Sequence, residues 1–315
     1  MMNNEISNLE LSYKMQSENF MESDEESARM RKSWFDEDTV DHWRHQRMIT
    51  PLAPLLDRFP SSSWLTVGDG RYGLDSVQLK KMKPSIETLP TDLSTVLLQK
   101  AKEMKIISDY RMENAEALSF ADNSFDFSFC KEAYHHFPRP YIAIYEMLRV
   151  SKKAIVFIEP NDKIEKKFPE AFLNAAKARI KKIFGRTIHH TDTWSFEESG
   201  NYIYMVSKRE MEKVALALQL PTVAFYFYND YYEPGVEFEK AVPGNKLFEK
   251  VKKIISRADL KSRLGIRNYS SIVAIVFKQR PEKELKIKLQ EAGFEVIDLP
   301  ENPYLKKRKE ELVNS

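Results

Sequence analysis

The chain has 315 residues, of which 42% are hydrophobic, enough to bury the core of one sizeable α/β domain with additions, or of two domains. Its single cysteine, Cys130, excludes an internal disulfide framework and a thiolate metal cage, and it suits a reducing compartment. The net charge of +2 argues against a dedicated nucleic-acid-binding protein, because such proteins usually carry a basic face.

The first residues lack a basic segment followed by an apolar one, and no run of about 18 apolar residues occurs, so we expect neither a secretory signal nor a membrane span. We therefore expect a cytoplasmic protein. The first 40 residues are acidic and residues 240–315 are basic. Two solvated segments of opposite charge explain this pattern, and a contact between them explains it too.

Residues 1–40 show irregular or weakly helical spacing, and helical spacing then runs up to Pro60, so residues 1–60 are interpreted as an N-terminal arm with a lead-in helix. From residue 61 short apolar runs alternate with amphipathic stretches, as in a doubly wound parallel sheet. Strands are predicted at 64–67, 85–89, 109–113, 125–130 and 154–158. Helices are predicted at 74–82, 94–102 and 140–150.

The alternation stops after residue 160. Residues 161–206 hold a basic helical stretch and an aromatic, histidine-rich stretch that fit no sheet-building unit, so they are interpreted as a cap insertion. Residues 207–280 resume the pattern and complete the core, with a loop insertion at 229–268 and a β-branched strand in "SIVAIVF". Residues 281–315 form a C-terminal extension with a helix, the short run "FEVIDL" and a charged end.

Three of the nine glycines lie in the six residues "GDGRYG", between the first predicted strand and the first predicted helix of the core. A glycine turn of this kind presents the free backbone NH groups of a helix N-terminus to a ligand. About twenty residues later Asp92 follows the second strand, where a carboxylate can accept the two hydroxyls of a ribose. A cofactor that contains adenosine fits both features, and so do a plain turn and a solvated aspartate.

A longer stretch distinguishes between such cofactors. Residues 113–160, "ENAEALSFADNSFDFSFCKEAYHHFPRPYIAIYEMLRVSKKAIVFIEP", resemble the core of class I S-adenosylmethionine-dependent methyltransferases, in particular those with a methyltransferase type 11-like core. With the glycine turn and "TDLS", the resemblance covers residues 63–160. It implies a doubly wound, Rossmann-like sheet of seven mostly parallel strands, the last of them antiparallel, with S-adenosylmethionine as the cofactor.

The resemblance also implies roles for individual residues. The loop residues Gly68, Gly70 and Gly73 would lie under the methionine part of the cofactor, with Asp92 on the ribose hydroxyls. Asn114 stands where an aspartate commonly meets the adenine amino group, the backbone of Ala115 would meet the adenine ring, and the main chain at Lys131 would help to hold the amino end. Thr66 replaces an acid that is common in the family, so we expect Asp69 or a water to contact the ammonium group.

Methyl transfer from a sulfonium needs an acceptor held in line, and a general base adds rate when the acceptor is a hydroxyl of high pKa. The family pattern places His135 and His136 beside the transfer site, and Glu159 ends the fifth strand at the same edge. Each is a candidate base, and each has a packing or loop-fixing alternative. Adjacent histidines point in different directions, so neither histidine pair alone predicts a metal site, and none is expected.

The cap insertion combines hydrogen-bonding groups with aromatic rings at His189, His190, Trp194 and Tyr202. These residues are candidates for acceptor binding, with ordinary packing as the alternative. We therefore predict a methyltransferase that transfers the methyl group in line to an oxygen of a small-molecule or glycan-type acceptor, with no nucleic-acid partner. A non-catalytic methyltransferase-like binding module and a dinucleotide-dependent oxidoreductase are the alternatives.

Overall fold

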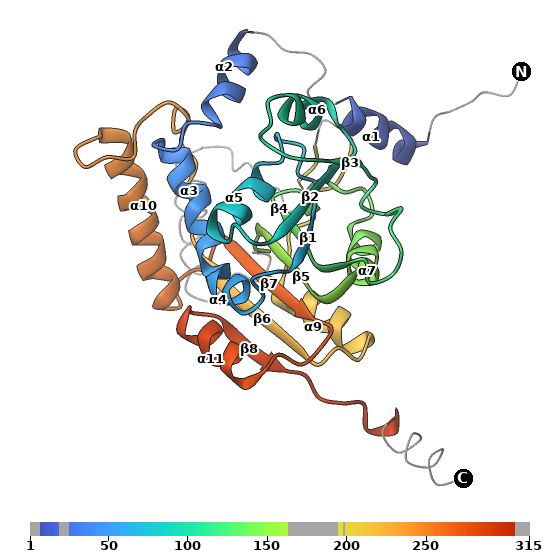
Figure 1. The fold of residues 1–315 in the computed structure, drawn as a ribbon. Helices are drawn as coiled ribbons and strands as arrows, with labels where there is room; N and C mark the ends of the chain where they lie inside the picture. The colour runs from blue at the N-terminus through green and yellow to red at the C-terminus, as the bar shows by residue number, and fades with distance from the viewer. Residues whose placement is uncertain (1–6, 19–24, 163–194, 198, 306–315) are drawn as a thin grey trace, which may run out of the picture.

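The computed structural model describes residues 7–18, 25–162, 195–197 and 199–305 (Figure 1). The strands are β1 (Ser63–Val67), β2 (Glu87–Asp92), β3 (Arg111–Met112), β4 (Phe125–Lys131), β5 (Ser151–Pro160), β6 (Thr222–Tyr228), β7 (Ser271–Phe277) and β8 (Glu295–Asp298). The helices are α1 (Asn8–Ser17), α2 (Glu25–Ser33), α3 (Val40–Ile49), η1 (Thr50–Leu52), α4 (Ala53–Arg58), α5 (Leu74–Met82), α6 (Val96–Glu103), η2 (Tyr134–His136), α7 (Pro140–Val150), α9 (Lys208–Ala217), α10 (Lys246–Arg263) and α11 (Lys283–Glu291).

All eight strands form one sheet in the order β3-β2-β1-β4-β5-β7-β6-β8. Pairing is parallel from β3 to β5, and β7 is antiparallel to both of its neighbours, β5 and β6. The expected doubly wound fold is confirmed, with eight strands in place of seven. The additional strand is β8, which pairs antiparallel with β6 and comes from the predicted "FEVIDL" run.

Both faces of the sheet are covered by helices, which explains the continuous apolar runs at 154–158 in β5 and 272–277 in β7. On one face, Phe157 of β5 and Phe225 of β6 belong to a core cluster with α7 and α9. On the other face, Trp64 and Phe127 stack with their ring centroids 4.4 Å apart, in a cluster with α3, α4 and α11. Figure 1 shows α3 and α4 on one side of the sheet and α7 on the other.

The N-terminal arm contains more regular structure than the weak helical spacing indicates. Helix α1 begins with a capping box, in which the side chain of Ser7 accepts from the backbone of Glu10 and the Glu10 carboxylate accepts from the backbone of Ser7. The helix docks on the core: the Ser12 hydroxyl donates to Asn201 at 2.7 Å, and the Gln16 amide donates to the backbone oxygen of His136 at 2.6 Å. The arm therefore reaches the edge of the sheet where the strands end.

The chain reverses its winding direction between β1 and β4, which are neighbours in the sheet but not in the sequence. Open α/β sheets bind ligands in the crevice that forms at the carboxyl ends of such strands.

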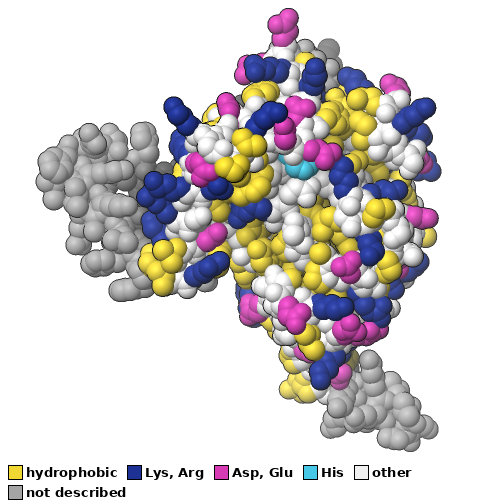
Figure 2. Space-filling view, turned by 60° about the vertical axis from the view of Figure 1, so that its left-hand side comes forward, with side chains coloured by type: hydrophobic (Ala, Val, Ile, Leu, Met, Phe, Trp, Pro, Cys, Tyr) yellow, Lys and Arg dark blue, Asp and Glu magenta, His cyan; other side chains and the backbone are white. Residues whose placement is uncertain are grey.

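The face of the molecule shown in Figure 2 intersperses acidic and basic side chains, without a broad region of one charge sign. Within the described ranges, no helix combines the length and the apolar character needed to cross a membrane.

Candidate functional site

A cavity of about 430 Å³ opens at the carboxyl end of the sheet. Four segments after successive strands line it, and the predicted residues among them are Gly68 and Gly70 after β1, Asp92 at the end of β2, Asn114 and Ala115 after β3, and His136 after β4. The volume lies within the usual range for small-molecule and cofactor sites. The fold thus brings six of the predicted site residues to the wall of one cavity.

The glycine turn is shaped around Asp92. A Cβ atom on Gly70 would lie 2.7 Å from Cγ and from Oδ2 of Asp92, so only glycine leaves this carboxylate in place. One Asp92 oxygen accepts from the backbone of Ser94 at 2.8 Å. Burial raises the pKa of Asp92 to about 6, against the lowering effect of the neighbouring backbone NH groups. The site thus holds a carboxylate that a ligand with hydroxyl groups can engage.

Two further residues of the turn, Gly73 and Asp69, shape the first turn of helix α5 next to the cavity. Gly73 adopts φ 67° at the N-cap, and a Cβ there would crowd Ile107 and Pro90. The buried Asp69 carboxylate accepts from the backbone of Asp75 at 3.1 Å and of Ser76 at 3.0 Å, the first turn of α5. Burial, together with the neighbouring Asp75 carboxyl group, raises the pKa of Asp69 above its usual value. Its carboxylate is engaged with its own helix, and Asp69 lines a second, smaller cavity next to the first.

Helix α1 forms one wall of the larger cavity through Tyr13, Met15 and Gln16. The Tyr13 hydroxyl donates to Glu116 at 2.6 Å, and Arg139 binds both the same carboxylate, at 2.6 Å, and the tyrosine hydroxyl, at 3.0 Å. Glu116 follows the predicted adenine-binding residues in the chain. The acidic arm therefore closes the side of the cavity that those residues line.

Lys131 ends β4, and its side chain is an ion-pair centre. The ammonium lies 3.3 Å from Asp75 and 3.1 Å from Glu132. Burial is the largest single influence on Glu132 and would raise its pKa, but the neighbouring basic groups, Lys131 first among them, together outweigh burial and hold that pKa well below its usual value. Glu132 lines both cavities and adopts φ 51°, an uncommon conformation for this residue type. Lys131 itself lines the smaller cavity.

Glu159 is fully enclosed and organises the loop after β4. One oxygen accepts from the backbone of Ala133 and of Tyr134, each at 2.9 Å, and the other lies 2.6 Å from Nδ1 of His135. Burial alone would lower the pKa of His135, but Glu159 outweighs it and raises that pKa. This geometry favours the loop-fixing alternative for Glu159, since its oxygens are occupied by the chain itself.

His136 is the histidine on the cavity wall. Its Nδ1 bonds to the carboxylate of Glu197, which also lines the cavity. The tautomer with a proton on Nδ1 leaves Nε2 as a proton acceptor, so the pair has the make-up of a general base held by a carboxylate.

The predicted cap residues divide into two groups. His189, His190 and Trp194 lie outside the described residues. Tyr202 packs edge-on against Phe196 and Tyr204, with ring centroids 5.8 and 5.1 Å away, and it lines neither of the two cavities. Its observed contacts correspond to the packing alternative.

Several cavity residues were missed by the sequence analysis: Tyr13, Gln16, Arg71, Glu116, Glu132 and Glu197. The sequence "SNLE" at Ser7 to Glu10 is a capping-box pattern, so it could have identified α1. Arg71 stands inside the glycine turn, and Glu132 directly follows a strand that ends at the ligand edge. No sequence pattern indicates Glu197 as a site residue, because its partner His136 is 61 residues away along the chain.

The residues present fit S-adenosylmethionine. The cavity has the volume for a nucleoside-sized ligand, Gly70 leaves room that a side chain would fill, and Asp92 supplies a half-buried carboxylate. Within the described ranges, no group of three or more histidine, cysteine or acidic residues is arranged to hold a metal ion.

The comparison with family models agrees with this interpretation. Residues 65–158 match the family model described as a methyltransferase domain. No curated protein matches the chain. Similar solved structures include the YcgJ protein of Bacillus subtilis, with 17% identity, coverage of 74% of this chain and 99% of that chain, and a TM-score of 0.45. Another is a SAM-dependent methyltransferase of Archaeoglobus fulgidus, with 15% identity, coverage of 78% and 99%, and a TM-score of 0.45.

The family match spans β1 to β5, the part of the sheet whose carboxyl ends build the larger cavity. Residues 65–158 thus match a methyltransferase domain, as the sequence resemblance implies.

Proposed function

We propose that this methyltransferase acts on a hydroxyl group of a small-molecule or glycan-type acceptor. The observation that carries the proposal is the larger cavity, where Asp92 and the glycine turn face the same space as the His136–Glu197 pair. Methyl transfer to a hydroxyl oxygen requires a bound cofactor and a general base that face the same cavity.

The cofactor-binding residues are assigned within this proposal. Gly68 and Gly70 lie beneath the methionine part, Asp92 accepts the ribose hydroxyls, and Asn114 and Ala115 border the adenine. Bound S-adenosylmethionine supplies an electrophilic methyl group. Gly73, Asp69 and Lys131 act indirectly, through the start of α5 and the ion pair at the end of β4. Residues 61–160 form the cofactor-binding core, and residues 161–206 remain the proposed cap.

His136 is the proposed base. Its Nε2 takes the proton of the acceptor hydroxyl, while Nδ1 stays bonded to Glu197, which stabilises the imidazolium that results. His135 is proposed to position His136, because the centroids of the two rings lie 4.0 Å apart. Glu159 holds His135 through its contact with Nδ1. The acceptor reaches the base from the side of the cap, where His189, His190, Trp194 and Tyr202 are proposed to contact it.

The cofactor half is tested by calorimetric titration with S-adenosylmethionine and S-adenosylhomocysteine. We expect binding of both, and Asp92→Ala weakens it. Absence of binding at millimolar concentration would contradict the assignment. The acceptor half is tested by methyl transfer from labelled S-adenosylmethionine to panels of alcohols, sugars, amines and oligonucleotides. Transfer to amines or nucleic acid, and not to hydroxyl compounds, would overturn it.

The proposed place of the reaction is the cytoplasm. Cys130 is buried as a free thiol, and burial raises its pKa well above the usual value, so it stays protonated and inert. The interspersed surface charge in Figure 2 supports the expectation that nucleic acid is not the partner.

A further inference from the structure

The second cavity lies between the lead-in helices and the start of α5. It measures about 90 Å³ and is lined by the α2–α3 segment, including Trp34, Asp41 and His45, and by α5, including Gln78. Gly68, Arg71 and Glu132 line it as well, and they also line the larger cavity. The two cavities therefore adjoin, and a molecule in the cofactor site has this second space as its neighbour.

Four of the carboxylates in this lining, those of Asp41, Asp69, Asp75 and Glu132, are already held by groups of the protein. Asp41 accepts from Arg44 at 2.8 Å, and Lys131 lies within 3.3 Å of both Asp75 and Glu132. Burial lowers the pKa of His45 well below its usual value, so its imidazole is neutral at physiological pH. An occupant with a net charge of either sign would have to displace these pairs, which favours an uncharged occupant.

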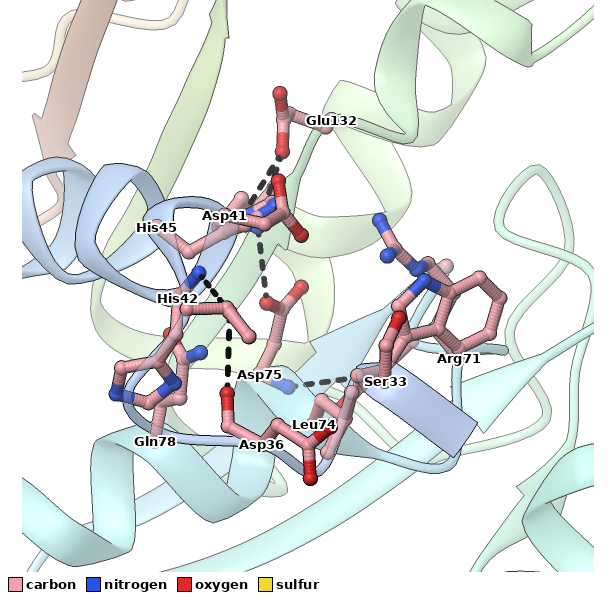
Figure 3. A pocket seen from close by; sticks show the side chains of 15 residues that line it. Ser33, Asp36, Asp41, His42, His45, Arg71, Leu74, Asp75, Gln78 and Glu132 are labelled. Carbon is pink, nitrogen blue, oxygen red and sulfur yellow. Dashed lines mark hydrogen bonds and ion pairs between the residues drawn. The ribbon is translucent and has the colours of Figure 1, made fainter. Parts of the chain in front are cut away.

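Two buried polar atoms of this lining have no hydrogen-bond partner in the described part of the chain: Nε of Arg71 and Oε1 of Gln78. The first is a donor and the second an acceptor. An ammonium group only donates and a carboxylate only accepts, whereas a hydroxyl group does both. Figure 3 shows Arg71 and Gln78 on opposite sides of the view with Asp75 between them, so several hydroxyl groups, and not one, would be needed.

The size of the cavity limits what enters it. A cavity of roughly 150 Å³ holds a benzene ring, so 90 Å³ takes one edge of a ring and not the whole of it. The rest of the occupant would extend past Gly68 and Glu132 into the larger cavity. Trp34 is part of this lining, and the Arg71 guanidinium covers one face of its ring, 4.0 Å from the ring centroid, so the aromatic ring and the hydrogen-bonding group lie side by side. Aromatic faces beside hydrogen-bonding groups suit molecules with an apolar ring face and polar edges.

We propose that the smaller cavity binds neighbouring hydroxyl groups of the methyl acceptor, so that the acceptor is an uncharged, polyhydroxylated molecule of the carbohydrate class that spans both cavities. The proposal rests on the proposed function and makes it more specific. It places acceptor recognition on the lead-in helices and on Gln78, in addition to the cap.

Ligand-detected saturation-transfer NMR tests the proposal with the full chain, with and without S-adenosylhomocysteine. The probes are the methyl glycosides of glucose, galactose and mannose together with myo-inositol, and ethanolamine and acetate serve as charged probes. We expect at least one hydroxylated probe to bind the protein at millimolar concentration while S-adenosylhomocysteine is bound. No binding of any hydroxylated probe at 100 mM, stronger binding of a charged probe, or displacement by S-adenosylhomocysteine would overturn the proposal.

The variant Gln78→Leu removes the unpartnered acceptor without breaking a described contact, and Gln78→Met replaces it if the leucine variant does not fold. The probe should bind the variant about threefold to tenfold more weakly, as for the loss of one hydrogen bond. S-adenosylhomocysteine affinity should be unchanged. Gln99→Leu on α6 is the matched control and should not alter probe binding. Equal binding to all three proteins refutes the proposal. If the unmodified chain does not bind S-adenosylhomocysteine, the proposed function itself is refuted.

Discussion

The contact between Gly70 and Asp92 gives the sharpest prediction. In Gly70→Ala the new Cβ would lie 2.7 Å from Cγ of Asp92, whereas ordinary contacts begin at 3.4 Å, so the carboxylate must move by about 0.7 Å. Hydrogen bonds form within a distance window of about 0.5 Å, so the displaced carboxylate would lose the bonds to the ribose that we propose for it. Such bonds to a charged group contribute about 1.5–3 kcal/mol, which corresponds to a tenfold to 150-fold loss of S-adenosylhomocysteine affinity.

Calorimetry on a double-mutant cycle tests the cause. Asp92→Ala should weaken binding by a similar factor, and Gly70→Ala in that background should cost nothing further within about 0.5 kcal/mol, because the colliding group is gone. Thermal unfolding of each variant controls for the fold. Additive losses in the cycle, or an unchanged affinity of Gly70→Ala, would falsify the reasoning.

Three further predictions concern the same region. Burial raises the pKa of Asp92 to about 6, and a ligand that donates hydroxyl groups binds the ionised carboxylate better than the protonated acid. Calorimetry should therefore show an S-adenosylhomocysteine affinity that is constant above about pH 7 and falls as the pH drops through about 6. The variant Asp92→Ala should flatten this profile. Glu159→Gln removes the charge that raises the pKa of His135, so imidazole NMR should show that pKa falling, and an unchanged value would contradict the contact. Tyr13→Phe removes the hydrogen bond between α1 and Glu116, so S-adenosylhomocysteine should dissociate about two- to tenfold faster in stopped-flow measurements, with little change in Tm. An unchanged dissociation rate would show that α1 is not a barrier to ligand release.

The core of the fold was predictable because its signals are local. The alternation of apolar runs with amphipathic stretches predicted helices at 74–82 and 140–150, and α5 and α7 have these bounds. Strand β3 was predicted at 109–113 but pairs only at Arg111–Met112, because its polar residues lie at the sheet edge. Helix α2 has five charged residues among nine, and the apolar residues of α1 alternate at Leu9, Leu11, Tyr13 and Met15, so neither segment shows clear helical periodicity.

The site was predictable only where one segment determines it. The glycine turn, Asp92 and the segment after β3 follow from strand ends, which meet at one edge in any parallel sheet. The partners of the histidines depend on tertiary packing. Glu159 was predicted at the correct edge, but its two oxygens face the loop after β4, and no sequence pattern indicates on which side a terminal carboxylate points. Glu197 and Tyr13 reach the cavity from distant segments, which explains why they were missed.

Strand β8 has a consequence for the behaviour of the protein in solution. Without it, the long apolar strand β6 would be the free edge of the sheet, with unpaired backbone groups able to recruit another chain. β8 replaces this edge with four residues whose ends are charged, and Glu295 and Asp298 are held by Lys208 and Lys286 at 2.6 and 2.7 Å. Resistance to edge-to-edge aggregation is thus encoded in the C-terminal extension, and a shortened chain that ends before β8 would lose it.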